Sequence, residues 1–478
     1  MTTIKILIYT DKRDIALAGS PLDWNLSTLA NALETNTPLF LKYEVQVINR
    51  FQSFNGSSPN PEPIRLTTEL LQQFDEIWFM GIYQQNEAVF SEPFGGPRNE
   101  LSTPEVTALE TWMNNAFGGV LITGDHADVR QGHPNDPIEK QLALGRAIGH
   151  LVPRAGKLRK WQGPPTISSQ HAFNTVGMGP VFPTQDDAIP QRLLFDQLDP
   201  RGVPHELFWG KDEQGNESFI DVFPDHEHEG GLQIPEPDGD WPPFKAPPGT
   251  VKPKAISIAS SMNFRPGGGR ESVLVVYDGD DLGVGRIVAD SSFHHYIDFN
   301  LQGFAKSPDQ SVLKSITQFF RNLAFYLIPL TKRQEITKAM FSRIASHPAV
   351  LEERSNRSEA IGKVAKSYLS LVASPIELNE MVHMLLPPVV RAESGNAFLP
   401  EAFANNAPSQ ELVLGSMISR HLKAVPVPEE AETGTALEST VPIDPFTAGL
   451  QDALQSHTEQ LKESAADNEK FLVLLSKI

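Results

Sequence analysis

The sequence predicts an α/β protein with a parallel sheet, followed by a helical extension at its C-terminus. Short apolar runs with the composition of β-strands recur between residues 4 and 290. One of these runs, 120–123, follows an amphipathic helix over 103–117, and the order strand, helix, strand implies parallel strands with right-handed crossovers. After about residue 306 the strand patterns stop, and the remaining segments have helical periodicity.

Three patterns predict the strands. The run 4–9 is mainly apolar, as in a buried parallel strand, whereas 43–48 alternates between apolar and polar residues. Residues 74–82 are rich in aromatic and β-branched side chains. The remaining predicted strands are 120–123, 255–259, 272–277 and 285–290.

The clearest predicted helix begins at Thr103, a good N-cap residue, with Pro104 at the first helical position. Its apolar face, which includes Leu109, indicates that one side is buried. Gly118 and Gly119 follow, and glycine is typical of a helix end. The other predicted helices are 26–33, 140–150, 311–327, 332–346, 354–371, 376–386, 410–423 and 447–478.

These elements divide the chain into an α/β domain, residues 1–305, and a helical region, residues 306–424. Within the α/β domain, residues 151–253 are rich in Pro, Gly and Asp, so we expect an irregular insertion there. Residues 425–446, rich in Pro, Glu and Thr, are expected to form a linker. Residues 447–478 are expected to form a long amphipathic helix.

Composition limits the classes of function. The formal net charge of the 478 residues is -19, which argues against binding to nucleic acids or to anionic membranes. The chain has no cysteine, which excludes disulfides, thiolate metal sites and thiol catalysis. The apolar run 4–9 is too short for a signal peptide, and no run approaches the ~18–20 apolar residues of a membrane span. We therefore expect a cytoplasmic protein.

Charged and imidazole side chains follow the predicted parallel strands. Asp11 follows the first strand, and Asp125 and His126 come directly after 120–123. Ligands of open α/β sheets bind beyond the carboxyl ends of the strands, so Asp125 and His126 are candidate catalytic residues. The alternative is that Asp125 only caps the turn that follows.

A second cluster, Asp225-His-Glu-His-Glu229, has the composition of a metal site. In an extended segment His226 and His228 face the same side. With Glu229 they would supply two imidazoles and a carboxylate to a divalent metal such as zinc or manganese, and leave a position open for water. Such a metal would lower the pKa of its water to about 7. The alternative is an acidic, solvated loop whose histidines bond to neighbouring carboxylates.

A third cluster, Asp290 with His294 and His295, ends the last predicted strand. In a strand, adjacent histidines would face opposite sides, so only one would point into a cleft, and we select His294 as a candidate catalytic residue. A structural histidine is the alternative. His171 is a further candidate, and the glycine-rich stretch 265–270 predicts either a hairpin loop or an anion site.

Three segments resemble motifs of a known family. They are Gly-Gly-Val-Leu-Ile-Thr-Gly-Asp-His at 118–126, His-Ala-Phe at 171–173, and the strand at 285–294 that ends in His294. On these segments, residues ~1–305 resemble the flavodoxin-like class I glutamine amidotransferase-like fold, and within it the ThuA-like branch. The resemblance implies that His126 and His294 are pocket histidines and that the ligand is sugar-like. Because the amidotransferase nucleophile is a cysteine, a Cys-dependent glutaminase is not expected.

Two classes of function remain open. The first is a hydrolase or lyase acting on a small polar substrate, through metal-bound water with Asp128 or Glu229 as general base, or through a His126–His294 acid–base pair. The second is a non-catalytic ligand-binding or assembly module on a degenerate amidotransferase-like fold. In that case the C-terminal helices would contact another subunit or a protein partner. Convergence of the histidine clusters would favour the enzyme.

Overall fold

The computed structural model describes residues 2–10, 15–19, 25–35, 41–49, 64–80, 103–116, 118–123, 159–160, 190–198, 202–212, 217–224, 231–232, 256–262, 270–280, 283–345, 358–373, 376–378, 380–381 and 410–424. The predicted helices at 140–150 and 447–478 and the predicted linker at 425–446 lie outside these residues. None of the described helices is long and apolar enough to cross a membrane.

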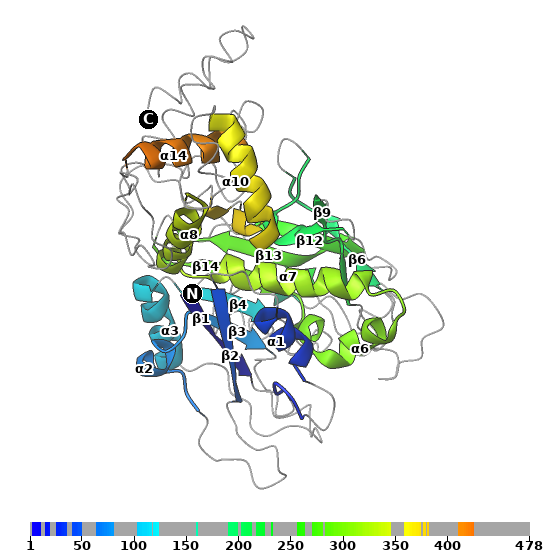
Figure 1. The fold of residues 1–478 in the computed structure, drawn as a ribbon. Coiled ribbons are helices and arrows are strands. Elements are labelled where there is room, and N and C mark those ends of the chain that lie inside the picture. The colour runs from blue at the N-terminus through cyan, green and yellow to red at the C-terminus, as the bar shows by residue number, and fades with distance from the viewer. Residues whose placement is uncertain are drawn as a thin grey trace, which may run out of the picture.

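A 10-stranded sheet forms the centre of the molecule (Figure 1). Along one half, each strand is parallel to its neighbours. The strands of this half are, in spatial order, β2 (Leu41–Asn49), β1 (Thr2–Thr10), β3 (Glu76–Met80), β4 (Gly119–Thr123) and β14 (Arg286–Asp290). The strand order reverses at β1, which pairs with β2 on one edge and β3 on the other. The prediction of a parallel sheet is confirmed for this half.

The other half of the sheet is antiparallel, so the sheet as a whole is mixed. β13 (Arg270–Asp278) pairs antiparallel with β14 and with β12 (Ile256–Met262). Residues 279–285 join β13 to β14, and a parallel crossover needs a dozen or more residues, so this connection permits only a hairpin. The strands β12 and β13 are consecutive in the chain and antiparallel, and most of the glycine-rich stretch 265–270 lies between them, outside the described residues. The half is completed by β5 (Arg159–Lys160), β7 (Leu194–Phe195) and β11 (Gly231–Leu232).

Helices cover both faces of the parallel half. On one face α1 (Ser27–Glu34), α6 (Asp298–Lys306) and α7 (Ser311–Leu327) contribute to a core with Ile6, Trp78 and Val288. On the other face α2 (Thr68–Leu71) and α3 (Thr103–Ala116) pack against Leu7, Phe79 and Ile287. Neighbouring strand residues thus alternate between the two cores, as the period of a strand requires.

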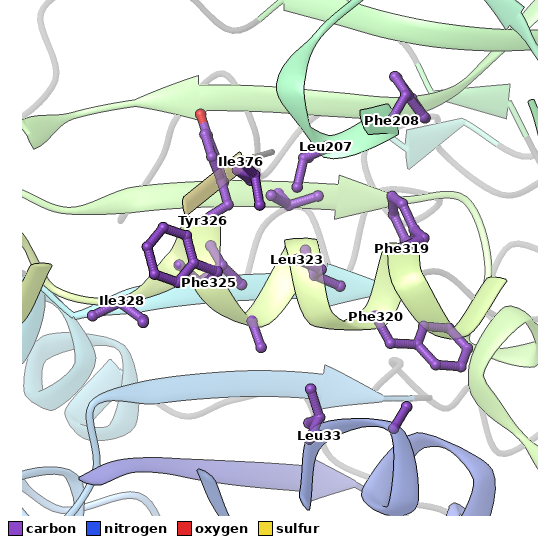
Figure 2. Packing of buried hydrophobic residues seen from close by; sticks show 14 of the residues in the cluster. Leu33, Leu207, Phe208, Phe319, Phe320, Leu323, Phe325, Tyr326, Ile328 and Ile376 are labelled. Atoms are coloured by element: carbon purple, nitrogen blue, oxygen red, sulfur yellow. The ribbon is translucent and has the colours of Figure 1, made fainter. Parts of the chain in front are cut away.

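Helix α7 has the bounds that the sequence predicts, and it contributes several large apolar side chains to its core, among them three phenylalanines. Figure 2 shows Phe319, Phe320 and Leu323 projecting from α7, with Leu207 and Phe208 above them and Leu33 below. The C-terminal helices follow. These are α8 (Leu330–Ala345), α10 (Ser358–Val372), a short helical stretch within 376–381, and α14 (Gln410–Ala424).

The expected irregular insertion, 151–253, contains regular structure where it is described. In addition to β5, β7 and β11, it includes β6 (Pro190–Arg192) paired with β10 (Val222–Pro224), β8 (Trp209–Lys211) paired with β9 (Glu217–Phe219), and the 3₁₀ helix η4 (Glu206–Phe208). Phe208 and Phe223 lie 6.2 and 4.7 Å, centroid to centroid, from the ring of Phe319 on α7. These short strands therefore pack on a distant helix, and their local sequence alone does not reveal them.

Gly118 and Gly119 are explained by close packing and not by a left-handed helix end, because neither has a positive φ. A Cβ on Gly118 would lie 2.1 Å from the Trp112 ring. A Cβ on Gly119 would lie 2.0 Å from the backbone oxygen of Leu327, at the end of α7. Only glycine lets α7 approach the start of β4 this closely.

Gly119→Ala is therefore expected to destabilise the protein by at least about 1–3 kcal/mol, because the obstacle is backbone and cannot move aside. Gly210→Ala is the matched control. Its Cβ would meet Ile220 at 3.4 Å, an ordinary contact, so we expect a change within about 0.5 kcal/mol. Urea unfolding of the full chain measures both, and equal midpoints for the two variants would contradict the packing argument.

Candidate functional site

The candidate site lies at the edge of the sheet where the parallel strands end. Thr10, Met80, Thr123 and Asp290 are the last residues of β1, β3, β4 and β14, and Asp290 is in register with Thr123. Open α/β sheets bind ligands at this edge, beside the point where the strand order reverses. β14 lies three strands from that point at β1, roughly 14 Å at ~4.8 Å per strand. The edge is the expected one, but Asp290 stands to one side of the reversal.

Asp290 is the centre of a buried hydrogen-bond network. Its side chain is fully buried, and it accepts hydrogen bonds from three groups that follow it in the chain. The backbone N–H of Ser292 donates to Oδ1 at 3.1 Å, and the hydroxyl of Tyr296 donates to Oδ2 at 2.7 Å. His295 Nδ1 lies 2.7 Å from Oδ1. Since a carboxylate can only accept, this contact places a proton on Nδ1.

The local sequence turns the chain so that these groups can reach Asp290. Directly after β14, Ser292 caps the 3₁₀ helix η6 (Phe293–Tyr296) by accepting a hydrogen bond from the backbone N–H of His294 at 3.1 Å. In a 3₁₀ helix successive side chains are about 120° apart. His294 and His295 therefore diverge, although not to opposite sides as in the expected strand.

The two histidines have different partners. His294 Nδ1 lies 3.3 Å from Oδ1 of Asn300 on α6, which is a neutral acceptor. His295 has the carboxylate, and its ring also packs 4.8 Å from the ring of Phe223 on β10. Both histidines are 1% exposed. Asp290 thus pairs with His295, and the role that we expected for His294 stays a prediction.

Tyr296 is held as a neutral hydrogen-bond donor. Burial raises the pKa of its hydroxyl well above 10, and the negative charge of Asp290 and the hydrogen bond to it raise it further. The ring packs against Trp78 on β3 and stacks on Phe320 of α7, at centroid distances of 6.2 and 5.4 Å. Tyr296 is not among the residues that the sequence predicts for the site, because the spacing Asp290–Tyr296 matches no periodic pattern of a helix or strand.

The other candidate residues lie outside the described part of the chain. These are Asp11, Asp125, His126, Asp128, His171, His226, His228 and Glu229. Asp125 and His126 follow Thr123, the last described residue of β4. His226 follows β10, the strand whose Phe223 contacts His295, and Asp221 forms an exposed ion pair with Arg192 at 2.8 Å.

Within the described residues, no three His, Asp or Glu side chains form a group that could hold a metal ion. Zinc or manganese at His226, His228 and Glu229 therefore stays a prediction.

A double-mutant cycle tests the network. Tyr296→Phe in the native background removes a hydrogen bond to a charged acceptor and is expected to cost about 1.5–3 kcal/mol. In an Asp290→Asn background the acceptor is neutral, so the same change should cost about 0.5–1.5 kcal/mol. Unfolding free energies of the four proteins provide the comparison, and additive effects would show that Tyr296 and Asp290 do not interact.

The chain has a weak structural likeness to solved proteins. A solved structure titled "mmIFT52 N-terminal domain" superposes with a TM-score of 0.34 and 13% sequence identity, over 67% of this chain and 97% of that chain. Such a likeness carries no argument about function. No protein-family model matches the chain, and no curated protein matches it at a significant level.

Proposed function

We propose that the protein is an acid–base hydrolase or lyase acting on a small polar substrate, with the pair Asp290–His295 at the centre of its site. The observation that carries the proposal is the 2.7 Å contact between Asp290 Oδ1 and His295 Nδ1 in a fully buried setting. A carboxylate at Nδ1 orients an imidazole and leaves Nε2 as the nitrogen that exchanges protons with a substrate. Asp290 would also stabilise the imidazolium when it forms.

The proposal also includes the candidate residues that the sequence predicts near the end of β4. Asp125 and His126 come two and three residues after Thr123, the residue of β4 that is in register with Asp290. We propose His126 as a second acid–base group, together with His294.

A metal at His226, His228 and Glu229 is the metal-dependent form of the same proposal. It is supported by the contact of β10, just before that segment, with His295. A metal ion bound there would supply an activated water molecule.

The proposed fold is flavodoxin-like, as in the class I glutamine amidotransferase-like and ThuA-like proteins. The parallel strands, renumbered in chain order, lie in the order 2-1-3-4-5, which is the flavodoxin-like arrangement. With no cysteine in the chain, the proposed chemistry is not that of a Cys-dependent glutaminase. A sugar-like substrate and a cytoplasmic location belong to this proposal as implications of the resemblance and of the composition.

A second candidate function is a non-catalytic ligand-binding or assembly module. The observation that favours it is burial, because Asp290 and His295 are each 1% exposed and every hydrogen bond described above for Asp290 comes from residues 292–296. A network of this kind also serves to hold η6 against the sheet. In the assembly case the C-terminal helices are the proposed contact with a second subunit or another protein.

Substrate screening with matched variants separates the two candidates. The full chain is assayed with p-nitrophenyl esters, p-nitrophenyl glycosides and sugar lactones. We expect turnover that falls about 10²–10⁴-fold in His295→Ala and Asp290→Asn, the usual contribution of a general acid–base group. His205→Ala is the control, because His205 is also buried but packs against Tyr326, away from this edge. Turnover unchanged in His295→Ala would contradict the catalytic proposal.

Metal content tests the metal-dependent form. Elemental mass spectrometry of the purified chain should find one divalent ion per molecule, retained in His205→Ala and lost in His226→Ala, since removing an imidazole ligand weakens the site. Only trace metal in the unaltered protein, even after zinc or manganese is added, would exclude this form and leave the metal-free acid–base pair.

A further inference from the structure

A buried cluster of charged residues lies at the opposite end of β14 from Asp290. Arg286 is the first residue of β14, Asp278 is the last residue of β13, and Asp280 lies in the turn that connects the two strands. Arg333 comes from α8, and Glu380 from the helical stretch within 376–381. We call these five residues the charged cluster.

Glu380 connects the two arginines of the charged cluster. Its Oε1 lies 2.9 Å from Arg286 and its Oε2 lies 2.6 Å from Arg333. Arg286 Nε lies 3.0 Å from Asp278 and 2.9 Å from Asp280, and Arg333 also pairs with Asp280. The pairs to Arg333 and Glu380 join the sheet to elements that lie far along the chain, so the charged cluster attaches the C-terminal helices to the sheet.

The charges of the cluster do not balance. Among the described residues, the ion pairs of the cluster join three carboxylates to two guanidinium groups, and the side chains of Arg286, Arg333 and Glu380 are no more than 3% exposed. A buried charge without a partner is costly, and the usual remedy is to bind a proton. Consistent with a surplus of acceptors, the buried Oδ1 of Asp280 has no hydrogen-bond partner among the described residues.

We propose that the charged cluster is a proton-dependent lock that holds α8 and the 376–381 stretch against the β13–β14 hairpin, closed when it carries one extra proton and weakened when that proton leaves. The proposal concerns the end of the sheet away from the candidate catalytic site, and it does not depend on the proposed function.

Asp278 is the carboxylate that takes up the proton. Burial is the main cause that raises its pKa, to about 6, and the negative charge of Asp280 adds to this, while Arg286 and Arg333 act in the opposite direction. Asp278 is also the most exposed member, at 20%, so a proton can reach it from solvent.

Tyr326, His205 and the two arginines of the cluster keep one charge state between pH 4 and 8. The Tyr326 ring on α7 lies 4.3 Å from the guanidinium carbon of Arg286, and burial raises its pKa well above 10. His205, before η4, packs against Tyr326, and burial lowers its pKa to about 3. The pKa values of Arg286 and Arg333 are raised by the surrounding carboxylates. Glu206 on η4 and Glu377 beside Glu380 are the remaining buried acids of these elements.

The direction of the pH effect follows from the raised pKa of Asp278. A carboxyl group whose pKa is higher in the folded state contributes stability fully below its ordinary pKa of 3.8. That contribution is lost as the pH rises through about 6. The lock is therefore expected to be tightest in mildly acidic solution and to open more often above pH 6.

Hydrogen exchange of the full-length protein tests the lock. Protection factors of the 376–381 stretch and of α8 are measured from pH 4.5 to 8, after correction for the intrinsic pH dependence of exchange. We expect the opening equilibrium to increase at least about tenfold across a transition near pH 6, the size of a shift of one pKa unit. Protection in β1 and β3 should change less.

Asp278→Asn mimics the protonated carboxyl and should keep the protection high and nearly constant over the whole pH range. Asp221→Asn, an exposed acid outside the cluster, is the control and should retain the transition of the unaltered protein. A flat profile in the unaltered protein, or a transition that persists in Asp278→Asn, would overturn the proposal. The first of these results needs no variant, so the test does not depend on the folding of Asp278→Asn.

Discussion

The structure depends on the burial of β14 between two halves of the sheet that run in different senses. β14 pairs parallel with β4 and antiparallel with β13, and all five of its residues are buried. Val288 faces the core beneath α7, and Ile287 and Ala289 face the core beneath α3. Its ends carry polar side chains that must be paired because they cannot reach bulk water. Arg286 at one end and Asp290 at the other therefore each organise a network. Each network includes an element that follows β14 in the chain, α8 for Arg286 and η6 for Asp290.

Helix α7 is the second element on which this arrangement rests. Its apolar side chains cover β4 and β14, and each fully buried Phe or Leu contributes about 1.5–3 kcal/mol. The same helix orders β10 and η4 through Phe319, and β10 in turn brings Phe223 against His295. Its last turn packs against Gly119, and the carbonyl of Tyr326 accepts a hydrogen bond from Arg286. One helix thus contacts both ends of β14 and the segment between them.

The sequence predicts a helix or strand where the apolar pattern of the element's own residues reflects its burial. It misses elements that form only through contacts with residues far along the chain. The run Ser311–Leu327 has a single apolar stripe, so the helix is predicted with its observed bounds, and the predicted strand 285–290 corresponds to β14. The antiparallel half of the sheet and the short strands of the insertion follow from hairpin length and from packing on α7. At the candidate site, the polar end of β14 was predicted, but the pairing of Asp290 with His295 was not, because it requires the 3₁₀ turn of η6. The charged cluster was not predicted either, because its members are separated by up to about a hundred residues along the chain, from Asp278 to Glu380.

In the catalytic proposal His295 exchanges protons with a substrate, and in the structural alternative it helps to hold η6 against the sheet. In both cases Asp290 fixes the tautomer of His295. Long-range ¹H–¹⁵N NMR of the histidine side chains, assigned with His295→Gln, reads that tautomer directly. At neutral pH the account predicts a proton on Nδ1 of His295 with Nε2 unprotonated, and loss of this pattern in Asp290→Asn. A proton on Nε2 in the unaltered protein, or a pattern that survives in Asp290→Asn, would contradict the pair on which the proposed chemistry is built.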